Sequence, residues 1–224
     1  MDATDRADSD INPSGRIEAF SDGVIAVAIT LLVLDLAVPE PAAGLTLGEQ
    51  LLAMWPNYLA YVVSFVAIGI MWINHHAMLR RLRGVDHTVL VLNLFLLLCI
   101  AVLPFTTSLL ATYLLVPDGG HLAAVVYAGS FLVTSIVFFG MQVHLMRRPQ
   151  LLRHPLAARE RRAILTRASL APPAYVLAGL LGVVEPYLTL AVCVVLGVLY
   201  LLPSWVRRRR HEPRREDAGA HDLG

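Results

Sequence analysis

The chain contains no lysine, and all 18 of its basic residues are arginines. Charged residues of both signs make up only 16% of the 224 residues, whereas hydrophobic residues make up 57%. Soluble domains typically have about 25% charged residues, so this chain has too few to solvate the surface of a soluble fold. The composition therefore excludes a soluble protein and favours an integral membrane protein.

Cysteine is also scarce, and the signatures of catalysis are missing. The two cysteines, Cys99 and Cys193, lie inside apolar runs, where a thiol acts as a small hydrophobe, and we expect no disulfide. The chain has no zinc-protease His-Glu pattern, no phosphate-binding Gly-Lys-Ser loop and no Gly-x-Ser-x-Gly elbow. We therefore predict that the protein is not an enzyme and needs no cofactor or metal.

The apolar residues gather in runs that are long enough to cross a bilayer. A transmembrane helix needs about 18 or more such residues, and continuous rather than alternating runs indicate helices. We predict an all-α fold with six transmembrane helices, at residues 17–38, 50–74, 88–115, 122–146, 163–184 and 187–206.

The arginines predict the orientation of these helices. Arginines occur before the first run, in the connections at 80–83 and 147–167, and after residue 206, but the connections 39–49, 116–121 and 184–186 have none. Positive residues favour the cytoplasmic side, so we predict that both termini are cytoplasmic in a multi-pass protein of the plasma (inner) membrane. The link at 147–167 is either an interfacial amphipathic helix or a segment that only enforces this topology.

Three regions follow from this pattern. Residues 1–15 form a polar cytoplasmic segment without the pattern of a cleaved signal peptide, and residues 16–206 form the six-helix domain. Residues 207–224 mix charges with Pro and Gly, which predicts a disordered tail that is held against anionic lipid headgroups.

The first helix carries an apolar stripe. At 100° per residue, Val27, Leu31 and Leu34 fall within about 60° of one another, and Thr30 lies about 60° from Val27. Asp35 lies at the edge of this stripe, about 80° from Val27 and near the outer end. Such a stripe is more often packed against lipid or another helix than exposed to a pore, so spacing alone leaves its role open.

Asp22 lies about 140° from Val27, on another side of the helix. A carboxylate within a membrane helix usually pairs with a donor or lines an aqueous path. Candidate partners lie at the same depth on the second helix, at Trp72, Asn74, His75 and His76. We predict that Asp22 joins an inter-helix network with these donors, although a proton relay remains the alternative. Neighbouring histidines point about 100° apart on a helix, which disfavours a metal site there.

Three segments carry a resemblance to a known family. RIEAFSDGVIAVAITLLVLDL, WINHHAMLRRLRGVDHTVLVLNLFLLL and LPFTTSLL resemble the prokaryotic members of the transmembrane protein 175 family, relatives of the endolysosomal potassium channel of animals. The similarity covers the first three predicted helices, and Arg16-x-x-x-Phe20-Ser21-Asp22 is its most specific motif.

The resemblance implies a homotetramer in which the first helices surround a cation pore without a re-entrant filter loop. It implies a constriction at Val27, Leu31 and Leu34, and a threonine layer at Thr30. This chain has Val27 where the family usually has a larger Ile or Leu. The resemblance also assigns Arg16, Ser21 and Asp22 to the inter-helix network with Trp72 and the histidines.

We therefore predict a potassium-permeable channel whose partners are potassium ions, membrane lipids and further copies of the chain, but not nucleic acid. Potassium sheds water more readily than sodium, so a narrow apolar tube with the Thr30 hydroxyls favours it. Asp35 either enriches cations at the outer mouth or is simply solvated. The alternative is a secondary or proton-coupled transporter with Asp22 as its titrating site, but the sequence lacks the inverted repeats of many such transporters.

Overall fold

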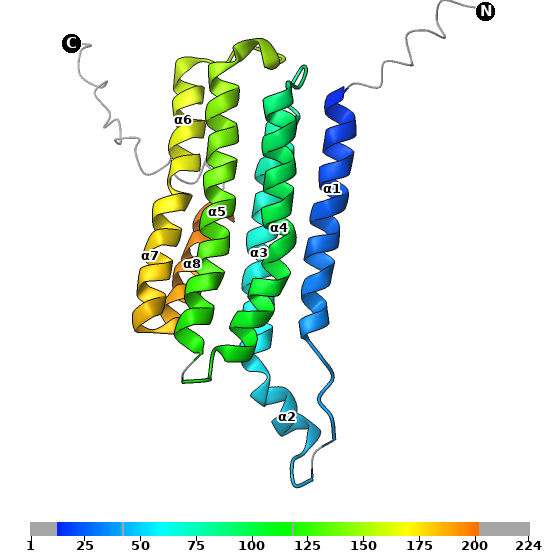
Figure 1. Cartoon of the computed structure of the whole chain (residues 1–224), viewed down its shortest axis with the longest axis vertical. Coiled ribbons are helices and arrows are strands. Elements are labelled where there is room, and N and C mark those ends of the chain that lie inside the picture. Colours follow the sequence, from blue (N-terminus) through cyan, green and yellow to red (C-terminus); the bar gives the residue numbers. More distant parts are fainter. Residues whose placement is uncertain (1–12, 42, 118, 202–224) are drawn as a thin grey trace, which may run out of the picture.

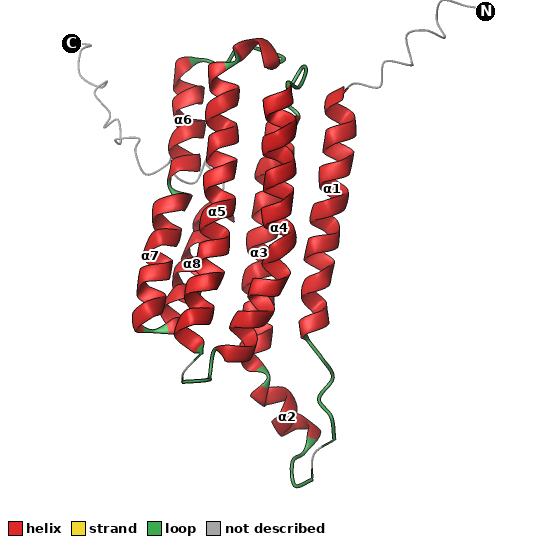
Figure 2. Ribbon diagram, viewed as in Figure 1, coloured by secondary structure: helices red, strands yellow, loops and turns green. Residues whose placement is uncertain are grey.

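The computed structural model describes residues 13–41, 43–117 and 119–201, which form a bundle of helices with no strand in these ranges (Figure 2). The prediction of an all-α fold is confirmed for this part of the chain. The elements are α1 (Pro13–Leu31), η1 (Leu32–Asp35), α2 (Leu47–Ala53), α3 (Trp55–Leu79), α4 (His87–Tyr113), α5 (Gly120–Arg147), η2 (Pro149–Leu151), α6 (Ala158–Ser169), α7 (Ala171–Val184) and α8 (Pro186–Leu201).

Five segments are long and apolar enough to cross a membrane, at Gly15–Asp35, Trp55–Leu79, His87–Tyr113, Gly120–Arg147 and Ala158–Val184. These segments make the chain a multi-pass membrane protein. The helix α8 is apolar but shorter, and the predicted sixth span extends past the last described residue. Nearly all of the predicted N-terminal segment 1–15 and the whole of the tail 207–224 lie outside the described residues.

Two predicted helices differ from the observed ones. The first was predicted to run to residue 38, but α1 ends at Leu31 and a 3₁₀ turn continues it only to Asp35. The predicted helix 163–184 is two helices, because α6 ends before Leu170 and α7 starts at Ala171. The break has a local cause, since Pro172 and Pro173 cannot donate to the preceding turn but fit the first turn of a new helix.

The helix α2 lies in a region predicted as a connection and the start of the second span. Its first turn is a capping box, in which Thr46 Oγ1 accepts a hydrogen bond from the Glu49 N–H and the Glu49 carboxylate accepts one from the Thr46 N–H. This backbone hydrogen bond from Thr46 holds the pKa of Glu49 below its ordinary value. The capping pair was visible in the sequence and explains why this short helix forms.

Figure 1 shows α3, α4 and α5 in the middle of the bundle, with α1 on one side and α6, α7 and α8 on the other. The middle helices are joined by buried hydrogen bonds, because Ser64 Oγ lies 2.9 Å from Tyr127 Oη and accepts a bond from Thr107 Oγ1 at 2.8 Å. Among the described elements, α1 packs mainly against α3 and α4. Much of its surface therefore has no neighbour within the subunit.

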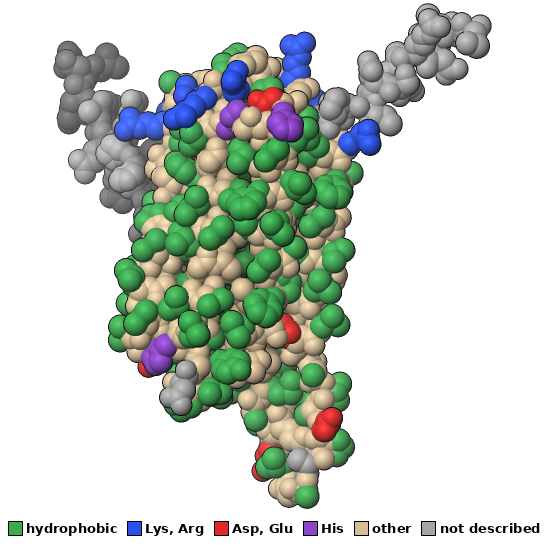
Figure 3. Space-filling view, viewed as in Figure 1, with side chains coloured by type: hydrophobic (Ala, Val, Ile, Leu, Met, Phe, Trp, Pro, Cys, Tyr) green, Lys and Arg blue, Asp and Glu red, His purple; other side chains and the backbone are tan. Residues whose placement is uncertain are grey.

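The connections that carry arginine lie together at one end of the bundle. Figure 3 shows the arginines in view gathered at this end, while hydrophobic side chains cover much of the surface between the ends. The connection after α3 pairs there with the segment after η2, through backbone hydrogen bonds from Arg83 N–H to Leu151 O and from Arg153 N–H to Arg81 O. We call this the arginine end. The pairing fastens the α3–α4 connection to the α5–α6 connection.

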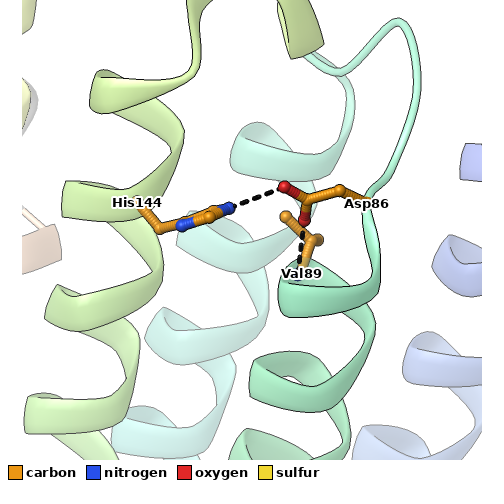
Figure 4. A network of polar contacts seen from close by, with 3 residues as sticks. All are labelled: Asp86, Val89 and His144. Atoms are coloured by element: carbon orange, nitrogen blue, oxygen red, sulfur yellow. Dashed lines mark hydrogen bonds and ion pairs between the residues drawn. The ribbon is translucent and has the colours of Figure 1, made fainter.

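A second contact at the arginine end joins α4 to α5 (Figure 4). Asp86 is the N-cap of α4, where its Oδ1 accepts a hydrogen bond from the Val89 N–H at 2.8 Å, and its Oδ2 lies 2.9 Å from His144 Nε2. Burial raises the pKa of Asp86, but the hydrogen bonds from Val89 and His144, together with the nearby positive charges of His144 and Arg148, lower it more, so the net pKa lies below the ordinary value of 3.8. The carboxylate therefore contributes stability above that value and loses it as the pH falls through the folded-state pKa.

Replacing Asp86 with Ala should destabilise the fold by about 1–2 kcal/mol, because it removes a helix cap together with the partner of His144. Thermal unfolding in detergent at neutral pH measures this loss. Asp86→Asn is the matched control, since Asn also caps helices and should keep most of the stability. An Asn variant as unstable as the Ala variant would show that the cap contributes little.

Candidate functional site

The helix α1 has one buried face and one uncovered face. Its buried face consists of Ser21, Ile25, Ala28 and Leu32. The predicted constriction residues lie on the uncovered face, where the exposed fraction is 57% for Val27, 43% for Leu31 and 71% for Leu34. The 3₁₀ turn rotates by about 120° per residue, so Leu34 lies directly above Leu31 rather than about 60° away as an α-helix would place it.

Thr30 is exposed beside this stripe, and its hydroxyl donates a hydrogen bond to the Val27 carbonyl at 2.8 Å. A threonine in a helix often makes such a bond to the carbonyl three or four residues earlier. This bond uses the hydroxyl proton but not the oxygen lone pairs. Because a cation is bound by the oxygen, the observed rotamer is compatible with a role in coordination.

Asp35 ends the 3₁₀ turn next to the start of α3. The Asn57 side chain donates to the Asp35 backbone carbonyl at 3.4 Å. The carboxylate is half-buried, and its Oδ2 is covered without a hydrogen-bond partner among the described residues. Within one subunit, Asp35 is therefore more enclosed than a fully solvated rim residue.

A buried network joins three helices near the arginine end. The Asn93 side chain of α4 donates from Nδ2 to Ser21 Oγ of α1 at 3.0 Å, and its Oδ1 lies 2.8 Å from His75 Nε2 of α3. Since a carbonyl oxygen only accepts, the His75 Nε2 carries the proton in this contact. All three side chains are at least 95% buried, so their hydrogen bonds have no water to replace them.

A second, half-exposed network joins α1 to the face of α3 that carries Trp72 and His76. The Trp72 indole N–H donates to Asp22 Oδ1 at 2.9 Å, and His76 Nδ1 lies 3.0 Å from Glu18 Oε1. The side chains of Glu18, Asp22 and His76 bring their ligand-type atoms within 4.8 Å of one another. These residue types can bind a metal, but Asp22 already accepts a bond from Trp72, and Glu18 Oε1 already lies beside His76 Nδ1.

Two predicted members of the network lie elsewhere. Asn74 donates to the Ile70 carbonyl of its own helix at 2.8 Å. Arg16 is exposed, and its side chain has no partner within the part of the chain that the structure describes. The buried network thus uses His75 and the half-exposed one uses Trp72 and His76, which project from α3 in a different direction.

Sequence analysis missed Asn93 and Glu18. Asn93 was visible as a single amide within the apolar run VLVLNLFLLL, where an isolated polar group usually has a partner. Glu18 lies four residues before Asp22 and therefore on the same face of α1. Neither signal identifies the partner, which lies on another helix.

Replacing Asp22 with Ala should lower the stability of the protein by about 1 kcal/mol, because the Trp72 indole loses its acceptor but remains partly exposed. Thermal unfolding and the yield of assembled protein measure this effect. Asp22→Asn is the control, since it keeps an acceptor at the same place. A variant that assembles normally and loses only pH-dependent transport would instead support the titrating role of Asp22.

Comparisons with known proteins agree with this arrangement. The family model described as the endosomal/lysosomal potassium channel TMEM175 matches residues 16–104. A protein of Chamaesiphon minutus named as a potassium channel is 41% identical over 193 residues, which cover 85% of this chain and 95% of the relative. A potassium channel of Streptomyces collinus is 42% identical over 190 residues, with 85% and 92% covered. The chain belongs to the TMEM175 family.

A solved structure extends the TMEM175 similarity to the fold. The crystal structure of a lysosomal potassium-selective channel TMEM175 homolog from Chamaesiphon minutus matches with a TM-score of 0.76 and 39% identity, over 84% of this chain and 95% of that one. The resemblance predicted from the three motifs is therefore confirmed. The exposed stripe and both polar networks lie within the residues that the TMEM175 model matches.

Proposed function

We propose that this TMEM175-family protein is a potassium-permeable channel, in which four copies place their α1 helices around a central pore. The proposed subunit has six transmembrane helices and no re-entrant filter loop. It lies in the plasma membrane with both termini in the cytoplasm. Relatives with more than 40% identity are named as potassium channels, which supports potassium as the ion.

The observation that carries the proposal is the uncovered face of α1. One helix cannot enclose a path, and the described residues leave much of the Val27, Leu31 and Leu34 side chains exposed. Four such faces around an axis would bury these side chains against one another and form successive apolar rings. The polar networks on the opposite face would hold α1 against α3 and α4 while these rings face the axis.

In this pore, the apolar rings control wetting and force a passing ion to shed part of its hydration shell. Potassium loses water at a lower cost than sodium, so the rings favour potassium without a carbonyl filter. The Thr30 oxygen would replace part of the lost water, and Asp35 would raise the local concentration of cations at the outer mouth.

Flux measurements test the function directly. Purified protein in liposomes should carry potassium down its gradient, faster than sodium and without a coupled proton gradient. Native mass spectrometry of the solubilised protein should show a tetramer. Strict dependence on a proton gradient would favour the transporter alternative, and a conducting monomer would remove the central pore.

Replacing Thr30 with Val should lower the potassium-to-sodium permeability ratio towards unity while current persists. Val keeps the shape of Thr but removes the oxygen that would coordinate the ion. Reversal potentials measured under bi-ionic conditions report the ratio, and Thr30→Ser is the control that keeps the hydroxyl. A wild-type ratio in the Val variant would assign selectivity to the apolar rings alone.

A further inference from the structure

A basic groove lies at the arginine end, between α3, α5 and α6, on the opposite side of α3 from α1 (Figure 1). Its volume is about 640 Å³. Four arginines line it, and no acidic residue does; the arginines are Arg81 of the connection after α3 and Arg159, Arg162 and Arg167 of α6. The groove therefore concentrates positive charge, and no carboxylate among the described residues lines it.

The spacing of the α6 arginines explains this concentration. Arg159 and Arg162 lie three residues apart and so share the face of α6 that turns towards α3 and α5. The one acidic residue of α6, Glu160, instead accepts a hydrogen bond from the Ala157 N–H at the start of the helix. The face of α6 that turns towards the groove is therefore basic, because the spacing of Arg159 and Arg162 places both on it.

The four arginines are not equally available. Arg167 donates to the Tyr200 carbonyl at 2.9 Å and lies over the Tyr200 ring, so its position is already determined. The side chains of Arg81, Arg159 and Arg162 are exposed and have no hydrogen bond or ion pair with any residue that the structure describes. Three guanidinium groups therefore face the groove ready to pair with an anion.

The groove continues into an apolar slot deeper in the bundle. Asn74, Phe138 and Ala168 line both spaces. The slot has a volume of about 80 Å³ and lies between α3, α5, α7 and α8, with a lining that is almost entirely hydrocarbon. From Ala77 of the groove to Ala67 at the far end of the α3 wall is about 10 residues, or about 15 Å along the helix axis. The charged groove and the apolar slot are thus arranged in the same order as the headgroup and acyl chains of a phospholipid.

One buried group in the groove lacks a partner. Gln142 of α5 is 95% buried, and its Oε1 accepts no hydrogen bond from any described residue. Gln142 lines the basic groove but not the slot below it. An unpaired amide oxygen is costly to bury, so this position favours an occupant that brings a hydroxyl donor beside the negative charge.

We propose that the groove and slot together bind an anionic phospholipid whose headgroup carries free hydroxyls, as phosphatidylglycerol does, taken from the leaflet at the arginine end. Arg81, Arg159 and Arg162 bind the phosphodiester, Gln142 accepts from a headgroup hydroxyl, and part of one acyl chain enters the slot. Basic pockets between helices at a membrane surface bind lipid headgroups in this way. The site is separate from α1 and does not depend on the proposed pore.

The test measures lipid binding to the full-length protein in detergent, by native mass spectrometry and by the rise in unfolding temperature with added lipid. Wild-type protein should retain phosphatidylglycerol in preference to phosphatidylcholine. The double variant R159Q/R162Q should bind phosphatidylglycerol about 25-fold more weakly, at about fivefold for each arginine removed. Both arginines are exposed, so this variant should fold.

Two matched controls separate the groove from general charge attraction. Arg161→Gln removes one arginine charge from the same helix, but Arg161 lines a different space, so binding should stay within twofold of wild type rather than fall about fivefold. Gln142→Leu should bind phosphatidylglycerol no better than phosphatidylmethanol, which has the same charge but no hydroxyl.

Three outcomes would overturn the proposal. If Arg161→Gln weakened phosphatidylglycerol binding as much as the double variant does, the lipid would be attracted to the arginine end as a whole and not bound in the groove. Glycerol phosphate that stabilises the protein as well as the lipid does would make this a site for free phosphates. Equal retention of phosphatidylcholine would show no anionic site. None of these experiments measures ion flux, so their interpretation does not depend on whether the protein proves to be a channel.

Discussion

Replacing Val27 with Trp should abolish potassium current in liposomes. The Val27 side chain lies on the uncovered face of α1, and in the proposed tetramer four indole rings at this level would fill the pore axis. Val27 borders a surface pocket that Ala101 of α4 also lines, so the larger side chain has room outside the packed core. Current should therefore disappear without loss of the fold, and native mass spectrometry checks that the assembly survives.

Two further variants make this result specific. Leu34→Ala should act in the opposite direction and raise conductance, because it widens a ring. Val33→Trp is the matched control, since Val33 is also exposed but points about 120° away from the line of Leu31 and Leu34 in the 3₁₀ turn. Val33→Trp should conduct. If Val27→Trp and Leu34→Ala both leave the current unchanged, the stripe lies against lipid or another helix and lines no pore.

Replacing Asn93 with Ala should destabilise the protein by about 2–5 kcal/mol. The change leaves both Ser21 and His75 buried without their partner, and each stranded group costs about 1–3 kcal/mol. The expected consequence is a large fall in unfolding temperature, or no assembled protein, because α1 and α3 lose the α4 side chain that bonds to both Ser21 and His75. Thermal unfolding of the purified protein measures it.

Asn74→Ala is the matched control for this experiment. Asn74 also lies in a membrane helix, but its amide bonds to the Ile70 carbonyl within α3. Its loss strands no side chain on another helix, so the unfolding temperature should change much less. Equal losses for the two variants would show that the three-helix network adds nothing beyond the removal of a polar side chain.

The sequence by itself determined the properties that depend on local periodicity. Helical spacing placed Val27, Leu31 and Thr30 on one side of the first helix and Asp22 on another, and the structure shows the same separation. The arginine-free connections and the apolar runs predicted the membrane class, and three short motifs predicted the TMEM175 family. The similar membrane depths of Trp72 and Asp22 also predicted Trp72 as a candidate partner of Asp22, and the structure shows their hydrogen bond.

Only the tertiary structure decided which helices lie side by side, and hence which polar groups meet. Asn93 bonds to both Ser21 and His75 because α4 packs between the faces that carry them. Glu18 of α1 lies beside His76 on a different face of α3. The basic groove likewise exists because α6, broken from α7 before Pro172, packs its arginine face towards α3 and α5. A helical repeat specifies the direction of a side chain about its own axis, whereas its partner depends on the lateral packing of other helices, which no local pattern encodes.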